Sequence, residues 1–293
     1  MASETAESSR DATALLQQSA IRSAATALAG QTLVMEWPDG PGQPSRTSRE
    51  VVSSSPVPAV VTGVDPSGKY DITVGATEHI MDRLCIRIDV RLAGSQQLRE
   101  QVWVDDLSGV FLRRETFENG QPSRSVAYLS LDIDAPGTQP SRMDEGREVS
   151  SPQQLAALRS AGWLVPAELP GSYELRRVYA HAGIVGMPLQ AVYSDGLYSV
   201  SLFIQSGRPD LGHLPPGAQE VGELSDRRAV EWSGQLPSRM VWAGPDQVFT
   251  LVGDAPHDEI ITIARSLPAA DSDSLLSRVR TGLRRMVQAI LPG

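Results

Sequence analysis

The four histidines and two short acidic stretches of this sequence are the first side chains to consider for metal binding or proton transfer. The histidines are His79, His181, His213 and His257. They are far apart, and none stands at a His-x-x-x-His or Glu-x-x-His spacing, which would place two metal ligands on one face of a helix. The sequence therefore predicts no metal site.

The acidic groups are the triplet His257-Asp258-Glu259 and the pair Asp105-Asp106. The triplet is typical of the first turn of a helix, where carboxylates complement the positive end of the helix dipole. The pair falls at a strand end before a turn, where aspartate is favoured because it hydrogen-bonds the turn backbone. The chain also lacks a Gly-x-Ser-x-Gly motif, a Cys–His signature and a phosphate-binding glycine loop. We expect no catalytic residue, no cofactor and no enzymatic activity.

Length and charge narrow the class of protein further. A chain of 293 residues favours two domains, and 41% hydrophobic residues suffice for ordinary cores. The formal charge of -9 argues against nucleic acid as a partner, because nucleic-acid binders place net positive charge against phosphates. The single cysteine, Cys85, lies among apolar residues and is expected to be a small buried hydrophobe.

The ends of the chain give two expectations about membranes. Residues 1–10 are small and polar and are expected to be disordered, and no signal peptide is visible there. Residues 271–293 predict an amphipathic tail helix with an apolar stripe and four arginines mostly off that stripe. This helix either contacts an anionic membrane surface peripherally or packs on its own domain.

Periodicity predicts the elements between these ends. Residues 11–30 have close to helical spacing, and Gly30 is expected to end that helix before a strand over residues 31–37. Residues 81–92 alternate apolar and charged side chains, as in an antiparallel strand with one wet face. Residues 101–133 read as three further strands, and Asn119-Gly120 favours a type I′ hairpin turn between the last two.

The three-stranded segment carries a family resemblance. Trp103 and Asp105 form a Trp-x-Asp strand, a turn at Gly109 follows, and residues 112–117 read Leu-Arg-Arg-Glu-x-Phe. The segment resembles the N-terminal domain of the MucB/RseB family of sigma-E regulatory proteins, here of an actinobacterial type. That domain is similar in fold to the lipoprotein carrier LolA.

A second set of motifs resembles the C-terminal domain of the same family. Trp163 and the Leu-Pro-Gly turn of residues 169–171 precede an aromatic strand, and a Tyr-Ser-Asp-Gly turn over residues 193–196 enters a second strand. The resemblance implies an α+β fold: a LolA-like curved antiparallel sheet with a helix over residues 11–134, and a smaller α+β domain over residues 151–270. The Pro- and Gly-containing residues 135–150 are expected to link the two.

The resemblance also implies a function. A member of this family is a non-enzymatic envelope-stress regulator outside the cytoplasm. It binds the extracytoplasmic peptide segment of a membrane anti-sigma factor, limits its proteolysis and senses a lipid or lipoprotein signal. The alternative, from a different class, is a LolA-like carrier that binds and transports lipid or lipoprotein.

Two sets of residues are candidates for these roles. Candidates for an apolar ligand groove are Leu33, Met35, Ile86, Ile88, Val90, Val102, Val104, Phe117, Leu129 and Leu131. Candidates for partner binding are Tyr193, Tyr198 and Phe203. Sequence alone leaves open whether the first set lines a groove or packs under the N-terminal helix.

Overall fold

The computed structural model describes residues 2–26, 28–37, 46–52, 65–133, 146–181, 188–207, 218–222, 224, 227–232 and 238–269. The chain divides into two compact units, Met1–Arg142 and Met143–Gly293. The division lies inside the interval expected to be a linker. The bounds and the relative size of the two predicted domains remain predictions. The predicted tail helix over residues 271–293 lies outside the described residues.

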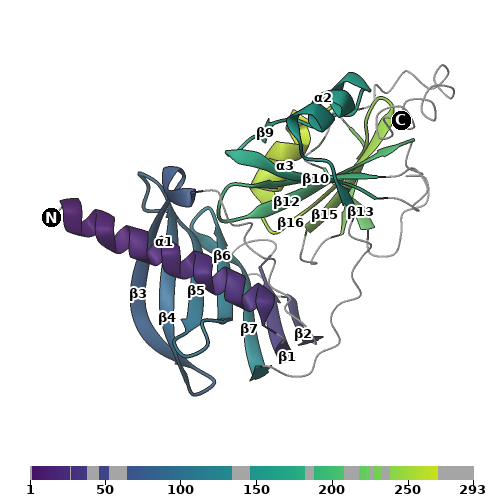
Figure 1. The fold of residues 1–293 in the computed structure, drawn as a ribbon. Coiled ribbons are helices and arrows are strands. Elements are labelled where there is room, and N and C mark those ends of the chain that lie inside the picture. Colours follow the sequence, from purple (N-terminus) through teal and green to yellow (C-terminus); the bar gives the residue numbers. More distant parts are fainter. Residues whose placement is uncertain are drawn as a thin grey trace. The chain divides into compact units, whose positions relative to one another are not determined.

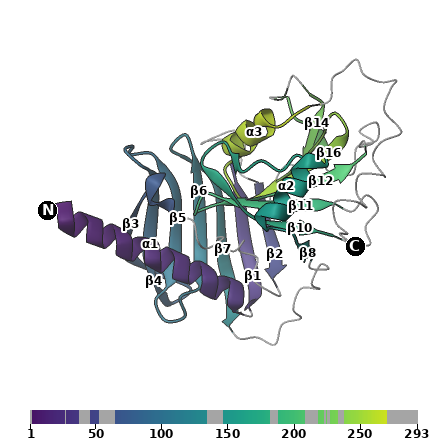
Figure 2. The ribbon, with the colours of Figure 1, turned by 45° about the horizontal axis from the view of Figure 1, so that its top comes forward.

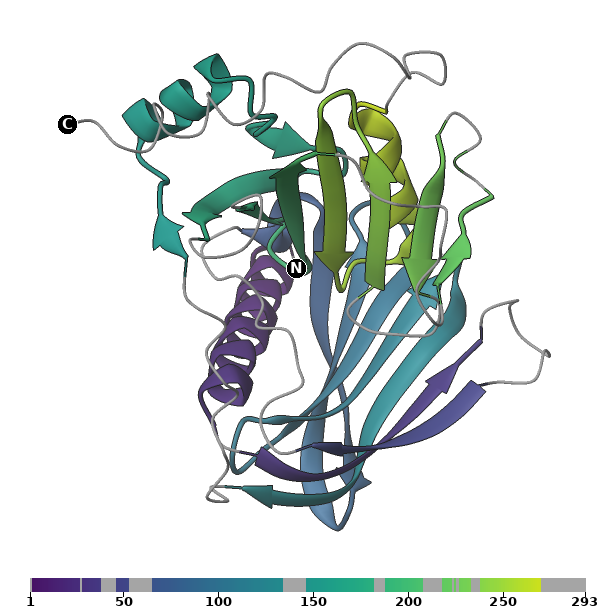
Figure 3. The same ribbon diagram turned by 90° about the vertical axis from the view of Figure 1, so that its right-hand side faces the viewer.

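The first unit is an antiparallel sheet with one long helix across it (Figure 1). The strand order is β2-β1-β7-β6-β5-β4-β3. Its elements are α1 (Ala2–Ala25), β1 (Leu28–Glu36), β2 (Arg46–Val52), the short 3-10 helix η1 (Pro66–Gly68), β3 (Tyr70–Ile80), β4 (Arg83–Leu92), β5 (Leu98–Asp105), β6 (Phe111–Glu118) and β7 (Gln121–Ile133). Strand direction turns steadily across the sheet, so β1 and β2 cross the direction of β3 and β4 (Figure 3). The expected curved antiparallel sheet with a helix is confirmed.

Both ends of α1 differ from their prediction. The helix begins at Ala2, and it thereby includes residues that were expected to be disordered. It ends at Ala25, and Gly30 lies within β1 instead of stopping the helix. A glycine stands at this strand position because the backbones of β1 and β7 approach closely there. A Cβ at position 30 would overlap the carbonyl oxygen of Ser130 on β7.

The hairpin between β6 and β7 confirms its turn prediction. Glu118 pairs with Gln121 across a two-residue loop, and Asn119 and Gly120 have φ of 51° and 75°. Two consecutive positive φ angles define the type I′ turn, whose twist matches that of the strands. This turn sets the pairing of β6 with β7 next to the loop, and an irregularity between Thr116 and Phe117 shifts the register of the remaining pairs.

The second unit is a larger antiparallel sheet with two helices (Figure 2). The strand order is β13-β14-β15-β16-β12-β11-β10-β8, and β9 also pairs with β10. Its elements are β8 (Arg147–Glu148), α2 (Pro152–Ser160), β9 (Glu168–Leu169), β10 (Tyr173–Ala180), β11 (Leu189–Ser194), β12 (Ser199–Ser206), β13 (Ala218–Glu220), β14 (Ala229–Trp232), β15 (Ser238–Ala243), β16 (Gln247–Gly253) and α3 (His257–Ser266). The α+β class is therefore confirmed for both units.

Local sequence explains where the two helices of this unit begin. Ser151 caps α2 in a full capping box with Gln154, and Pro152 occupies the first turn. Helix α3 begins at His257 and carries Asp258 and Glu259 in its first turn, as predicted. The triplet thus has a structural place, and Glu259 also accepts a hydrogen bond from the Tyr173 hydroxyl at 2.8 Å.

Candidate functional site

The ten groove candidates of the first unit do not share one face of the sheet. Ile88, Val90, Val102 and Val104 are at most 1% exposed. By register, Val90 lies opposite Ile72 of β3, the strand that contacts α1. These four residues, with the half-buried Ile86, therefore belong to the face that α1 crosses. They are packed under the helix in this structure.

The other five candidates are dispersed. Leu33 and Met35 are half-buried on the opposite face, because Leu33 aligns through Ala127 and Arg113 with Trp103. Phe117 is 9% exposed, Leu131 packs against the cluster around Leu28, and Leu129 is 42% exposed at a β-bulge. The structure does not bring all ten together, and a ligand groove remains a prediction.

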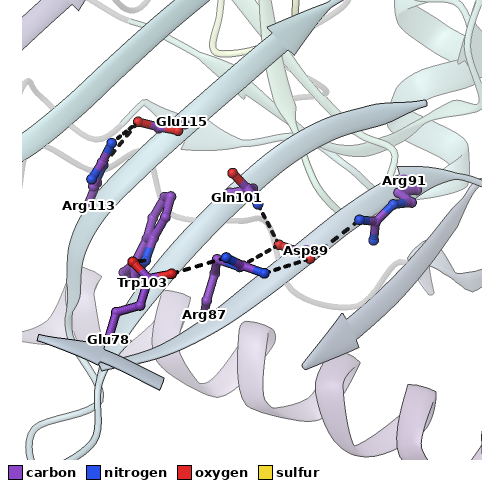
Figure 4. A network of polar contacts seen from close by, with 8 residues as sticks. All are labelled: Glu78, Arg87, Asp89, Arg91, Gln101, Trp103, Arg113 and Glu115. Atoms are coloured by element: carbon purple, nitrogen blue, oxygen red, sulfur yellow. Dashed lines mark hydrogen bonds and ion pairs between the residues drawn. The ribbon is translucent and has the colours of Figure 1, made fainter. Parts of the chain in front are cut away.

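The face opposite α1 carries a polar network instead of an apolar groove (Figure 4). Asp89 is its centre, since it accepts hydrogen bonds from Gln101 at 2.8 Å and from Arg91 at 3.4 Å. Arg87 bridges Asp89 and Glu78. The Trp103 indole N–H donates to Glu78 at 3.0 Å.

The network neutralises itself. Its three arginines are matched by three carboxylates: Arg87, Arg91 and Arg113 stand with Glu78, Asp89 and Glu115. The Arg113 guanidinium also lies 4.6 Å from the Trp103 ring centroid, a cation–π contact that covers the ring. Because every charge in it has an opposite neighbour, this face needs no ligand for its electrostatic balance. We interpret it as structural.

Asp105 is a buried support of the β5–β6 connection. Its carboxylate accepts two hydrogen bonds from Arg83, at 3.0 and 2.8 Å, and others from the Ser108 backbone and hydroxyl. Burial raises the pKa of Asp105, but the hydrogen bonds from Arg83 and Ser108 outweigh burial and lower it overall. The structural interpretation of the aspartate pair is thus confirmed for Asp105.

In the second unit, two of the three partner-binding candidates have no exposed surface. Tyr193 and Tyr198 are both 0% exposed. The Tyr193 hydroxyl donates to the carbonyl of Pro166 at 3.1 Å, and this tyrosine shares its strand face with the buried Ala191. Direct contact of these two rings with a partner is therefore a wrong prediction, because both fill the core on the helix side.

The turn between these tyrosines is held by its own side chains. Asp195 Oδ1 accepts hydrogen bonds from the backbone of Leu197 and Tyr198 at 3.0 and 2.8 Å. Ser194 accepts from Gly196 N–H at 3.0 Å, and Gly196 has φ of 95°. The Tyr-Ser-Asp-Gly motif is therefore a rigid hairpin turn that sets the register of β11 against β12.

Phe203 lies on the other face of the same sheet, at the centre of a surface that we name the open face. Strand pairing arranges this surface in two rows across β10, β11, β12, β16 and β15. One row is Arg177, Val192, Ser201, Val252 and Arg239. The other row is Tyr179, Gln190, Phe203, Thr250 and Val241.

The open face is amphipathic. Eight of its ten positions, all except the two arginines, are half-buried, whereas the alternate residues of β12, such as Leu202 and Ile204, are 0% exposed. The apolar Val192, Phe203 and Val252 thus stand among short polar side chains. Aromatic residues and arginines are enriched in protein interfaces, and this face carries Phe203, Tyr179 and two arginines.

Side-chain contacts hold part of the open face in place. Gln190 lies 3.0 Å from His181 Nε2 and donates to Ser201 Oγ at 3.1 Å. The His181 ring lies 6.4 Å from the Phe203 ring, measured between centroids. Phe203 is therefore presented by a preorganised surround, which lowers the entropic cost of binding.

The two outer positions of the first row are arginines. Arg177 and Arg239 are exposed, and neither makes an ion pair with a carboxylate of the described residues. Arg177 donates to the Tyr179 hydroxyl at 3.2 Å, which raises the pKa of Arg177. Arg239 lies over the Trp232 ring at 5.3 Å.

The residues around Phe203 were missed as site residues, although the alternation contained a signal for them. Along β12, Ser199, Ser201 and Phe203 alternate with a purely apolar set to which Tyr198 belongs. The purely apolar set fills a core, and the mixed set marks the surface. The arginines carried no comparable signal, because only the register places them at the two ends of one row.

Within the described ranges, no group of three or more His, Cys, Asp or Glu could hold a metal ion. None of the helices described is both long and apolar enough to cross a membrane.

Comparison with known proteins gives a likeness in structure only. No protein-family profile matches the chain, and no curated protein matches it significantly. A crystal structure of MucB in complex with the periplasmic MucA is similar at 17% identity and a TM-score of 0.43, over 88% of this chain and 99% of that chain. The structure of the Pseudomonas aeruginosa MucA/MucB complex is similar at 17% identity and a TM-score of 0.41, over 89% of this chain and 99% of that chain. For a crystal structure of MucB alone, the chain is similar at 16% identity and a TM-score of 0.44, over 88% of its own length and 98% of that chain.

Proposed function

We propose that this chain is a non-enzymatic regulator outside the cytoplasm that binds the extracytoplasmic segment of a membrane anti-sigma factor. The segment would lie on the open face of the second unit, around Phe203. The sequence motifs in both units support the proposal through their family resemblance. The observation that carries it is the mixed composition of the open face, which is neither a sealed core nor an ordinary charged surface.

The open face gives the proposal a physical mechanism. A protease needs its substrate segment extended and free in the active site. A segment that packs its apolar side chains against Val192, Phe203 and Val252 is withdrawn from that state for as long as it is bound. Proteolysis then depends on the fraction of time that the segment is free, so tighter binding limits cleavage.

The first unit would supply the response to a lipid or lipoprotein signal. Ile88, Val90, Val102 and Val104 are covered on the side that α1 crosses. An acyl chain could reach them only if α1 moved, and burial of that chain would then favour the moved state. A signal of this kind acts by population shift, provided that the moved state binds the anti-sigma segment less well.

Binding to an anti-sigma segment tests the proposal directly. The full chain is titrated into fluorescently labelled peptides that cover the extracytoplasmic segment of the anti-sigma factor encoded nearest to its gene. We expect saturable binding, and we expect Phe203→Asp to weaken it at least tenfold because it places a charge in the apolar centre. Val51→Asp, at an 83% exposed valine of β2, is the matched control and should leave binding unchanged.

Two results would contradict the proposal. One is the absence of binding by every peptide. The other is unchanged binding by a Phe203→Asp variant whose thermal unfolding shows an intact fold. Copurification of the chain with lipid, together with no peptide binding, would instead support the lipid-carrier function.

A further inference from the structure

The open face has a charge pattern that bears on which segment it accepts. Arg177 on β10 and Arg239 on β15 end the same row, and the three positions between them are uncharged. The second row contains no acidic or basic residue between Tyr179 and Val241. The open face therefore has an apolar and polar centre with a positive charge at each end.

The surrounding charges leave these arginines available. Glu148 of β8 lies opposite Tyr179 in the strand register. Its negative charge helps to raise the pKa of Arg177, although the two side chains form no ion pair. The neighbouring Arg176 pairs with Glu174 at 3.5 Å. Arg239 contacts Trp232, and Glu231 next to it faces the helix side, where it lies 3.8 Å from His257. The chain as a whole has a net negative charge, whereas this row carries two arginines and no carboxylate.

We propose that the open face selects an extended segment with an apolar centre and two carboxylates six residues apart. This inference rests on the proposed function and names the chemistry of its partner. The carboxylates would bind Arg177 and Arg239, and the apolar residues between them would pack on Val192, Phe203 and Val252.

The spacing follows from sheet geometry. Arg177 and Arg239 are separated by four inter-strand steps of about 4.8 Å, which is about 19 Å. An extended chain advances about 3.3 Å per residue, so about six residues span that distance. Six is an even number, so both carboxylates and the second and fourth residues between them point to the same side. A spacing of five residues would turn one carboxylate away from the sheet.

Four labelled synthetic peptides test the pattern on the full chain by fluorescence anisotropy at low ionic strength. The first contains Glu-Ser-Val-Ser-Val-Ser-Glu between Gly-Ser ends. The second has glutamine in place of both glutamates, the third has lysine there, and the fourth lacks the last serine so that the glutamates are five residues apart. We expect the first to bind at least fivefold more tightly than each of the others.

Charge variants of the chain identify the site. Arg177→Glu and Arg239→Glu should each weaken binding of the first peptide about fivefold to tenfold, and Glu148→Gln should strengthen it. Arg228→Glu is the matched control: it makes the same change of charge in the same unit, at an arginine that is 54% exposed and pairs with Glu220. Equal binding of the four peptides, or equal loss in the control, would overturn the inference.

The outcomes separate this inference from the proposed function. If the anti-sigma segment binds and Phe203→Asp weakens it, but neither arginine variant has an effect, the proposed function stands and the charge pattern falls. If the first peptide binds selectively and no anti-sigma segment does, the pattern stands and the proposed partner is wrong.

Discussion

Replacement of Asp105 tests whether the first unit depends on one buried carboxylate. The side chain of Asp105 is 2% exposed, and that of its partner Arg83 is 33% exposed. Removing one member of a fully buried ion pair costs about 3–5 kcal/mol, because the other charge stays buried and unpaired. Since Arg83 can regain water, Asp105→Ala should fall at the lower end, at about 3 kcal/mol. Asp105→Asn keeps one acceptor oxygen and should cost about 1–2 kcal/mol.

The assay must read the first unit separately. Hydrogen exchange with mass spectrometry in increasing urea reports on peptides from residues 83–118, and peptides from residues 189–206 of the second unit serve as an internal control. We expect the urea midpoint of the first set to fall and that of the second to stay unchanged. If Asp105→Ala lowers the free energy of unfolding of the first unit by less than about 0.5 kcal/mol, the reasoning is refuted, because the ion pair then contributes almost nothing to stability.

The pH dependence gives a second reading of the same carboxylate. The pKa of Asp105 is lowered in the folded protein from an ordinary value of 3.8. A lowered pKa means that the ionised carboxylate stabilises the fold fully above pH 3.8, and that this contribution is lost as the pH falls through the folded value. The difference in stability between the wild-type chain and Asp105→Asn should therefore be constant at neutral pH and narrow below pH 3.8. A gap that widened on acidification would contradict the assignment.

Three further substitutions test other parts of the fold. Gly30→Ala should destabilise the first unit by about 2 kcal/mol or more, because its Cβ meets the Ser130 carbonyl, and urea unfolding read by hydrogen exchange near residues 28–36 would show it. An unchanged midpoint would mean that β1 and β7 can separate at no cost. Ser151→Ala should cost about 1 kcal/mol through loss of the capping box, seen as faster exchange in α2, and equal exchange rates would count against the cap. Tyr193→Phe should cost about 1 kcal/mol in the second unit by leaving the Pro166 carbonyl without its donor, whereas no change in midpoint would show that the bond contributes nothing.

Much of the local structure could be predicted from short stretches of sequence. The Asn119-Gly120 turn, the capped start of α2 and the acidic first turn of α3 follow from interactions within a few residues. The alternation in β4 and β12 likewise identified two distinct faces for each strand. These features are local, because turn geometry, capping and strand period act within one element.

The face of the sheet on which each candidate site residue lies could not be predicted from local sequence. Ile88 and Met35 both look like groove residues in the sequence, yet the pairing of β1 with β7 places Met35 on the face away from α1. Tyr198 and Phe203 are two aromatic residues five positions apart on one hairpin, yet one fills the core and the other faces outward. An odd separation in a strand changes the face, and only packing decides which face is covered.

The sequence by itself thus determined the class of fold, the turns and the strands, because these depend on the period and chemistry of neighbouring residues. The tertiary structure alone decided that Asp89 and Trp103 belong to a self-neutralised network, and that Gly30 lies against a strand about a hundred residues away. It also brought Arg177 and Arg239 into one row of the open face. Both arginines lie on strands far apart in the sequence, and only the register of four intervening strand pairs fixes their separation.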